Sequence, residues 1–228
     1  SLEMSGDQLA SRMISAESEI ALQKLRRADL NNEDWEQLNN RIRQLLHCTM
    51  FVDDTASQTI FEIRAKARRL KMQHDIQLLI IDYLQLMRGE DKNNREQEIS
   101  GISRGLKAIA KELDVPVIVI SQLSRQVEQR GGAHRPILSD LRDSGAIEQD
   151  ADMVMFLYRP EYYKIDEWED GSPTQGGAEI IIAKHRNGAL KDARIRFIGQ
   201  YTKFTDLETT FEVTEPDYQF NPNRSEFP

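Results

Sequence analysis

The sequence predicts an α/β protein, with helices flanking a mainly parallel β-sheet and a C-terminal β-hairpin at the edge of that sheet. The apolar runs at 78–81 and 115–120 are typical of parallel strands buried on both faces. Between them, apolar residues recur at intervals of three and four over 99–113, which predicts a helix and therefore a βαβ unit. The third observation is Asn187-Gly188 between two short apolar segments, a strong signal for a tight hairpin turn.

The N-terminal part of the chain is predicted to be mostly helical. A capping-box pattern opens it, and the apolar spacing predicts helical regions over about 9–25 and 35–46. Residues 49–52 are a candidate for a short strand, and a capped helix is predicted over about 57–72. This helix leads into the first buried strand.

The C-terminal part combines strands with long connections. A polar stretch at 122–147 is predicted to be a functional loop, and a further strand follows at 153–158. Residues 159–177 are interpreted as a surface insertion, after which 180–183 and 193–198 form the two strands of the hairpin. Folds with parallel sheets bind ligands at the carboxyl ends of their strands. Polar residues at those ends are therefore the first functional candidates.

Length and composition limit the possible classes of protein. The 228 residues suffice for one sizeable core, which we assign to residues 1–210, and the tail 211–228, rich in Pro, Asn and acids, is predicted to be disordered. A single cysteine, four scattered histidines and the absence of long apolar runs argue against disulfides, metal-ligand motifs and membrane spans, and favour a cytoplasmic protein. The net charge of −8 argues against a basic nucleic-acid coat, although a few cations can still act within a channel.

Two polar residues end the two buried strands. Asp82 follows the first strand, where a carboxylate is costly unless it binds a cation such as magnesium or its water shell. An aspartate that caps a turn is an equally good explanation. Gln122 follows the second strand and could sense a phosphate or orient water, although loop solvation is the ordinary alternative. The functional interpretation depends on the pairing of both residues across one βαβ unit.

A third candidate, Glu3, directly precedes a predicted helix. If a strand came before it, Glu3 would lie at the same sheet edge and could polarise an attacking water molecule. The alternative is a first-turn glutamate that is stabilised by the helix dipole.

Cationic residues are concentrated in two further places. Lys184 and Arg186 lie beside the hairpin turn, with His185 between them facing the other way, and could project beyond their own domain as arginine-finger groups. A solvated cationic sheet edge is the alternative. The arginines of the long loop suit contacts with phosphates. Its acidic residues make a solvated mixed-charge loop an equally good explanation. These residues are Arg125, Arg130, Arg135 and Arg142, with Asp140, Asp143 and Glu148.

Five sequence motifs stand in register along the chain. They are SLEMS at 1–5, LIIDYLQL at 79–86, SQLSR at 121–125, SDLRDSGAIEQDAD at 139–152 and AKHRNG at 183–188. Their order and spacing closely resemble those of the DnaB family of replicative DNA helicases. Over roughly residues 1–207, the likeness is to the C-terminal motor domain of this family, a RecA-like P-loop NTPase core.

The resemblance implies a role for each candidate. Glu3 matches the catalytic glutamate, Asp82 the Walker B aspartate that holds Mg²⁺ through water, and Gln122 the sensor of the γ-phosphate of ATP. Lys184 and Arg186 match the cations that are donated to the nucleotide of the neighbouring subunit.

Other matches concern the surroundings of the nucleotide and of DNA. Arg12 matches an arginine near the nucleotide. Arg142, Asp143 and Gly145 match the pore loop that grips the backbone of single-stranded DNA, with Asp143 standing where many relatives have glutamate. The shorter side chain of Asp143 affects how this loop would grip the DNA backbone.

The resemblance also implies an assembly and a mechanism. Six identical subunits would form a ring with ATP and Mg²⁺ at each interface, and hydrolysis would move the pore loops along one DNA strand while the other strand is excluded. Primase and a helicase loader are the implied partners. Base identity should matter little, because backbone contacts carry no sequence information directly.

One expected element is missing from the sequence. No G-x-x-x-x-G-K-[ST] loop occurs, although its backbone amides and lysine cradle the phosphates in this class of NTPase. In the family this strand-loop-helix unit lies just before the position of Ser1, so we expect the chain alone to be inactive. A deliberate truncation, a partial gene, proteolysis or, more specifically, an intein junction at Ser1 would each account for its absence.

Two alternatives are open at this point. A RecA-like recombinase or clock-type ATPase shares the Walker B and sensor residues but is not expected to carry the block at 142–152. A nonenzymatic RecA-like module that binds helicase subunits, loader or primase fits the missing phosphate loop.

Overall fold

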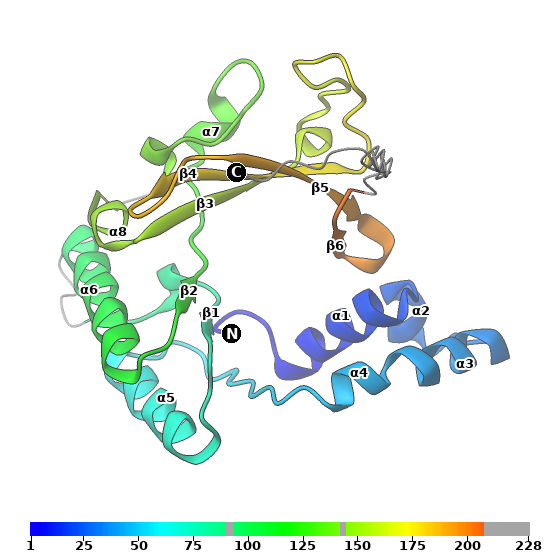
Figure 1. Ribbon diagram of the computed structural model, residues 1–228, viewed down its shortest axis with the longest axis horizontal. Helices are drawn as coiled ribbons and strands as arrows, with labels where there is room; N and C mark the ends of the chain where they lie inside the picture. The colour runs from blue at the N-terminus through cyan, green and yellow to red at the C-terminus, as the bar shows by residue number, and fades with distance from the viewer. Residues whose placement is uncertain (90–93, 142–144, 208–228) are drawn as a thin grey trace, which may run out of the picture.

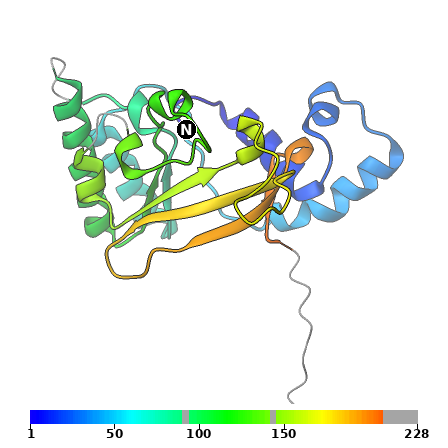
Figure 2. The ribbon, with the colours of Figure 1, turned by 90° about the horizontal axis from the view of Figure 1, so that it is seen from above.

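The computed structural model describes residues 1–89, 94–141 and 145–207 (Figure 1). The predicted disordered tail at 211–228 lies outside these residues. The described residues form two sheets, a parallel pair of order β1-β2 and an antiparallel sheet of order β3-β4-β5-β6. Figures 1 and 2 both show α5 and α6 at one end of the molecule and α1 to α4 as a helical lobe at the other. The predicted α/β class is confirmed, with the parallel part confined to two of the described strands.

The parallel pair and its helix form the predicted βαβ unit. Strand β1 (Leu79–Ile81) pairs in parallel with β2 (Val117–Val119), and α6 (Arg95–Leu113) connects them. Helix α6 is preceded by Asn94, whose side chain accepts hydrogen bonds from the first-turn amides, and it is followed by Asp114, whose backbone is in the left-handed region. The spacing of apolar residues in the sequence therefore located this unit correctly.

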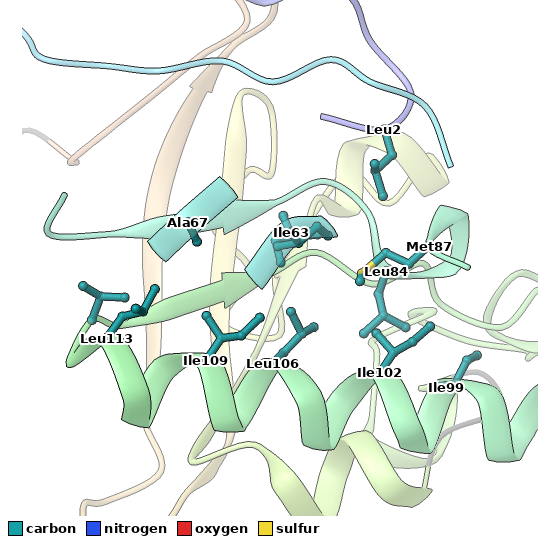
Figure 3. Close-up of a cluster of buried hydrophobic side chains, with 12 residues drawn as sticks. Leu2, Ile63, Ala67, Leu84, Met87, Ile99, Ile102, Leu106, Ile109 and Leu113 are labelled. Atoms are coloured by element: carbon teal, nitrogen blue, oxygen red, sulfur yellow. The ribbon is translucent and has the colours of Figure 1, made fainter. Parts of the chain in front are cut away.

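The main core lies between α6, the parallel strands and α5 (Ile60–His74). The apolar stripe of α6 faces α5 and the turn after β1, as Figure 3 shows. Gly105 allows the two helices to approach, because a Cβ atom there would lie 2.6 Å from Cγ1 of Ile60. The α6 residues of this core are Ile99, Ile102, Leu106, Ile109 and Leu113.

The second sheet consists of β3 (Met153–Tyr158), β4 (Gly177–His185), β5 (Asp192–Ile198) and β6 (Lys203–Thr205). All neighbouring strands in it are antiparallel, and β4 with β5 is the predicted hairpin. Strand β6 pairs with the side of β5 that faces away from β4, so β6 is an edge strand of this sheet. The hairpin was predicted at the sheet edge, but it lies between β3 and β6. In β3, alternate side chains are buried, and the exposed ones between them, Met153, Met155 and Leu157, are apolar as well.

The N-terminal lobe contains four helices where two helical regions were predicted. They are α1 (Gly6–Ser18), α2 (Leu22–Arg27), α3 (Asn32–Arg41) and α4 (Arg43–Leu46). Helix α1 is followed by Glu19, whose backbone has a φ of 56°. The carboxylate of Glu19 accepts a hydrogen bond at 2.7 Å from Lys203, which lies on β6, so this lobe is tied to the edge of the second sheet.

The predicted strand at 49–52 is wrong. Its backbone pairs with no strand in the described part of the chain, and the side chains of Met50, Phe51 and Val52 are exposed. An apolar run becomes a strand only where a sheet edge satisfies its amide and carbonyl groups. The phenyl ring of Phe51 instead lies 4.5 Å from the imidazole of His74, centroid to centroid.

The predicted long loop contains short helices. They are α7 (Gln126–Gln129), a 3₁₀ turn (Leu138–Asp140) and α8 (Gly145–Asp150). The part of the chain that the structure describes has three further 3₁₀ turns, at Leu84–Leu86, Pro160–Tyr163 and Gly199–Tyr201. No helix in the described ranges is both long and apolar enough to cross a membrane.

Among the described residues, both sheets expose apolar side chains. Ile80 of β1 lies in register with Ile118 of β2, and both are exposed, as are Met155 and Leu157 on β3. Parallel sheets normally have both faces covered. Among the described strands, β2 and β3 also each pair on one side only, so each has an edge that could accept another strand.

The pH dependence of stability can be predicted from Asp53. Burial raises its pKa, but hydrogen bonds from Lys66, Thr55 and Gln58 outweigh this and hold the pKa well below its ordinary value. The carboxylate therefore stabilises the fold above the unfolded pKa, and this contribution is lost as the pH falls through the folded value. Because the side chain is 41% exposed, Asp53→Asn should cost only about 0.5–1 kcal/mol at pH 6, and less at pH 3. Urea unfolding at both pH values measures this, and an equal loss at both would contradict it.

Candidate functional site

The carboxyl ends of β1 and β2 meet the N-terminal segment. The amide of Leu2 donates a hydrogen bond of 2.6 Å to the carbonyl oxygen of Asp82, which places Glu3 next to the strand end. The amide of Ile120 donates to Ile81 at 2.9 Å and that of Leu84 donates to Ile120 at 3.0 Å, so the two strand ends are joined. The structure thus places the backbone segments of all three predicted strand-end residues at one edge of the parallel pair.

Sequence reasoning missed Gln85, whose side chain connects the two strand ends. Its amide nitrogen donates to the hydroxyl of Ser121 at 2.9 Å and to the carbonyl oxygen of Gln122 at 3.3 Å, and its amide oxygen accepts from the Gln122 amide at 3.2 Å. The guanidinium of Arg95 donates to the Gln85 carbonyl oxygen at 2.6 Å. Gln85 therefore sets the position of the Gln122 backbone, and its only sequence signal is its place three residues after Asp82.

These residues suit a hydrated magnesium ion better than a directly coordinated metal. Within the described ranges, no group of three or more His, Cys, Asp or Glu side chains could hold a metal. Magnesium is usually held by one or two carboxylates together with waters and substrate phosphates. The half-buried Asp82 and the exposed Glu3 fit that pattern. This sequence contains no motif that supplies the backbone amides and the lysine that cradle phosphates.

Lys184 and Arg186 lie at the end of β4 and in the following turn. They do not extend freely from the hairpin: the ammonium of Lys184 donates to the carbonyl oxygen of Glu148, and to that of Gln149 at 3.3 Å. The guanidinium of Arg186 also donates to the Gln149 carbonyl oxygen, at 3.3 Å. Both cations thus contact the carboxyl end of α8, next to which the β4–β5 turn lies in Figure 1.

Asp152 joins these cations to α6. Its carboxylate accepts a hydrogen bond from Arg186 at 3.0 Å and another from Lys107 on α6. The hydrogen bond from Lys107 is the main reason that the pKa of Asp152 lies below its usual value, and the positive charges of Lys107, Arg186 and Lys184 lower it further. In the isolated chain, Lys184 and Arg186 thus contact α8 and Asp152 of their own chain rather than projecting beyond it, and their predicted role toward a neighbouring nucleotide stays a prediction.

Two of the loop arginines have structural partners. Arg130 pairs with Asp140, and Arg135 pairs with Glu179 on β4 and with Asp192 on β5. Both are therefore engaged within the protein rather than free to contact phosphates. The exposed Arg125 lines a shallow pocket of about 350 Å³ with Ser124, Gln126 and Gln129.

The remaining predicted site residues are only partly described. Arg12 is exposed on α1, and Gly145 is the first residue of α8. Arg142 and Asp143 lie outside the described residues, so their predicted contact with DNA stays a prediction.

Comparison with known proteins gives consistent results. The family model described as "DnaB-like helicase C terminal domain" matches residues 1–206. The replicative DNA helicase DnaB of Geobacillus stearothermophilus is 50% identical over 217 residues, which cover 94% of this chain and 46% of the relative. The replicative DNA helicase DnaC of Bacillus subtilis (strain 168) is 48% identical over 214 residues, which cover 93% and 46%. The chain thus spans about half the length of these relatives.

Solved structures show the same likeness in three dimensions. The structure of a DnaB-like replicative helicase, described with its interactions with primase, has a TM-score of 0.82 and 42% identity, over 91% of this chain and 49% of that chain. A second solved structure, described as an ATPase domain, has a TM-score of 0.83 and 42% identity, over 91% and 73%. With the family model matching residues 1–206, these likenesses show that the chain belongs to the DnaB-like helicase C-terminal domain family.

Proposed function

We propose that this chain is part of the ATP-driven motor of a hexameric replicative DNA helicase, which translocates on single-stranded DNA and unwinds the duplex at the replication fork. Family membership supports the class of motor. The observation that carries the proposal for this chain is the junction of the two strand ends, where Leu2 bonds to Asp82 and Gln85 bonds to Gln122.

Each residue at this junction has one task in the proposal. Asp82 holds Mg²⁺ through water, and Glu3 polarises the water that attacks the γ-phosphate of ATP. Gln122 contacts that phosphate with its amide. Magnesium, when bound, neutralises charge on the phosphates.

Groups from a neighbouring subunit complete the proposed site. Lys184 and Arg186 stabilise the charge that develops on the neighbour's nucleotide, as cations supplied in trans do in other phosphoryl-transfer enzymes. Arg12 lies near the nucleotide in this proposal. The family and the need for trans-acting cations support a ring of identical subunits.

Single-stranded DNA is the proposed track for the motor. Arg142, Asp143 and Gly145 contact its backbone, so that binding depends on salt more than on base sequence. Primase and a helicase loader are the proposed partners; one of the similar solved structures is described with its interactions with primase.

The chain alone is proposed to be inactive as an ATPase. Its sequence has no phosphate-binding loop, and the exposed apolar side chains on β1, β2 and β3 suit a further layer of the intact protein. The free edges of β2 and β3 suit an additional strand in the same way.

ATP hydrolysis tests the proposal directly. The 228-residue chain is compared with an extended protein, defined as this chain joined to the preceding family segment that carries the phosphate-binding loop. We expect turnover only by the extended protein, with stimulation by single-stranded DNA. A folded extended protein that hydrolyses no ATP would overturn the motor assignment.

A nonenzymatic interaction module is the second candidate. The missing phosphate loop and the exposed side chains of Ile80, Ile118 and Met155 favour it, because an uncovered apolar sheet face suits binding to another protein. A stable assembly with helicase subunits, loader or primase that ignores ATP would support this candidate. An assembly that changes with ATP would exclude it.

The contacts of Gln85 give a prediction for the extended protein. Gln85→Leu removes the three hydrogen bonds to Ser121 and Gln122, so the sensor shifts while the phosphate-binding elements stay in place. We expect kcat to fall about tenfold, roughly 1.4 kcal/mol in the barrier, with KM for ATP changed less than about twofold. Steady-state kinetics measure both.

Gln77→Leu is the matched control for this prediction. Gln77 is also a glutamine beside β1, but among the described residues its side chain bonds to Asp75 alone, at 2.8 and 2.9 Å. It should leave kcat unchanged. If both variants lowered kcat equally, Gln85 would have no specific role in positioning Gln122.

A further inference from the structure

We propose that the carboxyl end of α8 and the side chain of Asp152 form a latch that holds Lys184 and Arg186 until the phosphates of a neighbouring subunit's nucleotide withdraw them. Release of the latch frees the end of α8, so nucleotide engagement at the interface is communicated to that helix. This inference rests on the proposed trans-acting role of the two cations. Asp152 acts in it as a positioning residue.

The first step of the argument concerns the stability of α8. The helix has six residues, Gly145–Asp150, and helices this short are marginal without tertiary support. Its last carbonyl groups have no hydrogen-bond donor within the helix. Lys184 and Arg186 donate to two of them, those of Glu148 and Gln149, and positive charge at a helix carboxyl end is favourable.

The second step concerns the anchoring of Arg186 by Asp152. The amide of Arg186 donates to the Asp152 carbonyl oxygen at 2.8 Å, and its guanidinium donates to the carboxylate at 3.0 Å. The same carboxylate also accepts a hydrogen bond from Lys107, a residue of α6, which is the helix that carries the main core. Asp152 therefore ties the β4–β5 turn and α8 to a rigid part of the fold.

The third step is competition for the guanidinium. One terminal nitrogen of Arg186 donates to Asp152 and the other to Gln149, so the pair that would grip a phosphate bidentately is already in use. Arg186 must leave both partners to bind a phosphate in this way. The side chains of Arg186 and Asp152 are 51% and 59% exposed, and exposed pairs are weak enough to be broken by a multiply charged anion.

The consequence reaches the start of α8. The helix begins at Gly145, which is itself one of the residues proposed to contact DNA. Loss of the contacts at its carboxyl end lowers the stability of the whole helix, because so short a helix has few internal hydrogen bonds. The latch thus gives a physical route by which nucleotide at one interface alters the start of α8, where Gly145 is proposed to contact DNA.

Hydrogen exchange in the 228-residue chain tests the latch without any enzymatic activity. In Lys184→Ala/Arg186→Ala we expect the amides of Gln149, Asp150 and Ala151 to exchange at least about fivefold faster, with the core amides of β3 and α6 unchanged. Arg194→Ala is the matched control, because it removes a cation from the adjacent strand that pairs with Asp170 instead. Unchanged exchange in α8 of the folded double variant would overturn the latch.

Turnover by the extended protein tests the positioning role of Asp152. Asp152→Asn weakens the hold on Arg186, so we expect ATP turnover without DNA to rise about threefold and the stimulation by single-stranded DNA to fall by the same factor. Asp170→Asn, which weakens the pair with Arg194, should change neither. If Asp152 had only a structural role, the variant would lower ATP turnover with DNA and ATP turnover without DNA by the same factor. That result would overturn the proposal. If the extended wild type hydrolyses no ATP, the proposed function fails, while the exchange experiment still decides the latch.

Discussion

Replacing Arg186 by alanine in the extended protein is expected to lower ATP turnover about a thousandfold, since arginines supplied in trans are worth about 10³–10⁵ in phosphoryl transfer. Nucleotide binding should change little, because the phosphates of each nucleotide are bound mainly by the phosphate-binding loop of one subunit, whereas Arg186 comes from the neighbouring subunit. Steady-state hydrolysis and equilibrium binding of a nucleotide measure the two effects separately. Turnover equal to wild type would remove the trans-acting assignment.

The location of Arg186 in the fold calls for a specific control. In the isolated chain Arg186 contacts Asp152 and Gln149, so its loss could act on α8 rather than on a neighbouring nucleotide. Arg194→Ala removes another surface cation, one that lies on β5, and should leave turnover within about twofold, as expected for a surface substitution away from the site.

Mixed rings separate the two explanations for an inactive Arg186→Ala variant. When this variant is mixed with Asp82→Asn, each protein is inactive alone, but an interface between them can combine an intact Asp82 with an intact Arg186. We expect mixing to restore part of the activity. An absence of restored activity in rings shown to contain both subunits would contradict action in trans.

The second large effect is expected in the core of α6. Ile109 is completely buried against α5 and the parallel strands (Figure 3). Ile109→Ala removes packed methyl groups and leaves a cavity, so the free energy of unfolding should fall by about 2–5 kcal/mol. This is a large part of the about 5–15 kcal/mol available to a typical domain. Urea unfolding followed by circular dichroism measures the loss.

Two further substitutions make the stability experiment specific. Ile109→Val removes one methylene group and should cost about 0.5–1.5 kcal/mol. Lys111→Ala, on the exposed side of the same helix, should change stability by no more than about 0.5 kcal/mol. Similar losses for all three variants would indicate a general effect on helix formation and would contradict the cavity explanation.

Local patterns predicted the parallel unit correctly. The apolar runs at 78–81 and 115–120 became β1 and β2, and the apolar stripe between them became the buried face of α6. The strand at Met153–Tyr158 and the hairpin around Asn187-Gly188 were also located from sequence. These features depend on residues that are near one another in the chain, because side-chain periodicity and turn chemistry are local properties.

The failure at residues 49–52 has the opposite cause. The apolar run there has the composition of a strand, but no described strand pairs with it. Pairing depends on a sheet edge formed by distant residues, and no local pattern reports whether that edge exists. The break between α1 and α2 was missed because Glu19, a non-glycine residue, adopts left-handed backbone angles there. The break between α3 and α4 falls at Ile42, whose backbone stays in the right-handed region, and it was missed as well.

By itself, the sequence determined the α/β class, the core helix α6, the two strand ends that carry Asp82 and Gln122, and the motifs that place the chain in its family. Only the tertiary structure decided that Gln85 joins those strand ends and that Arg186 folds back onto Asp152 and α8. The reason is physical. These contacts join residues more than thirty positions apart, and whether two such polar side chains meet depends on how the sheets and helices pack, which no periodicity in the sequence records.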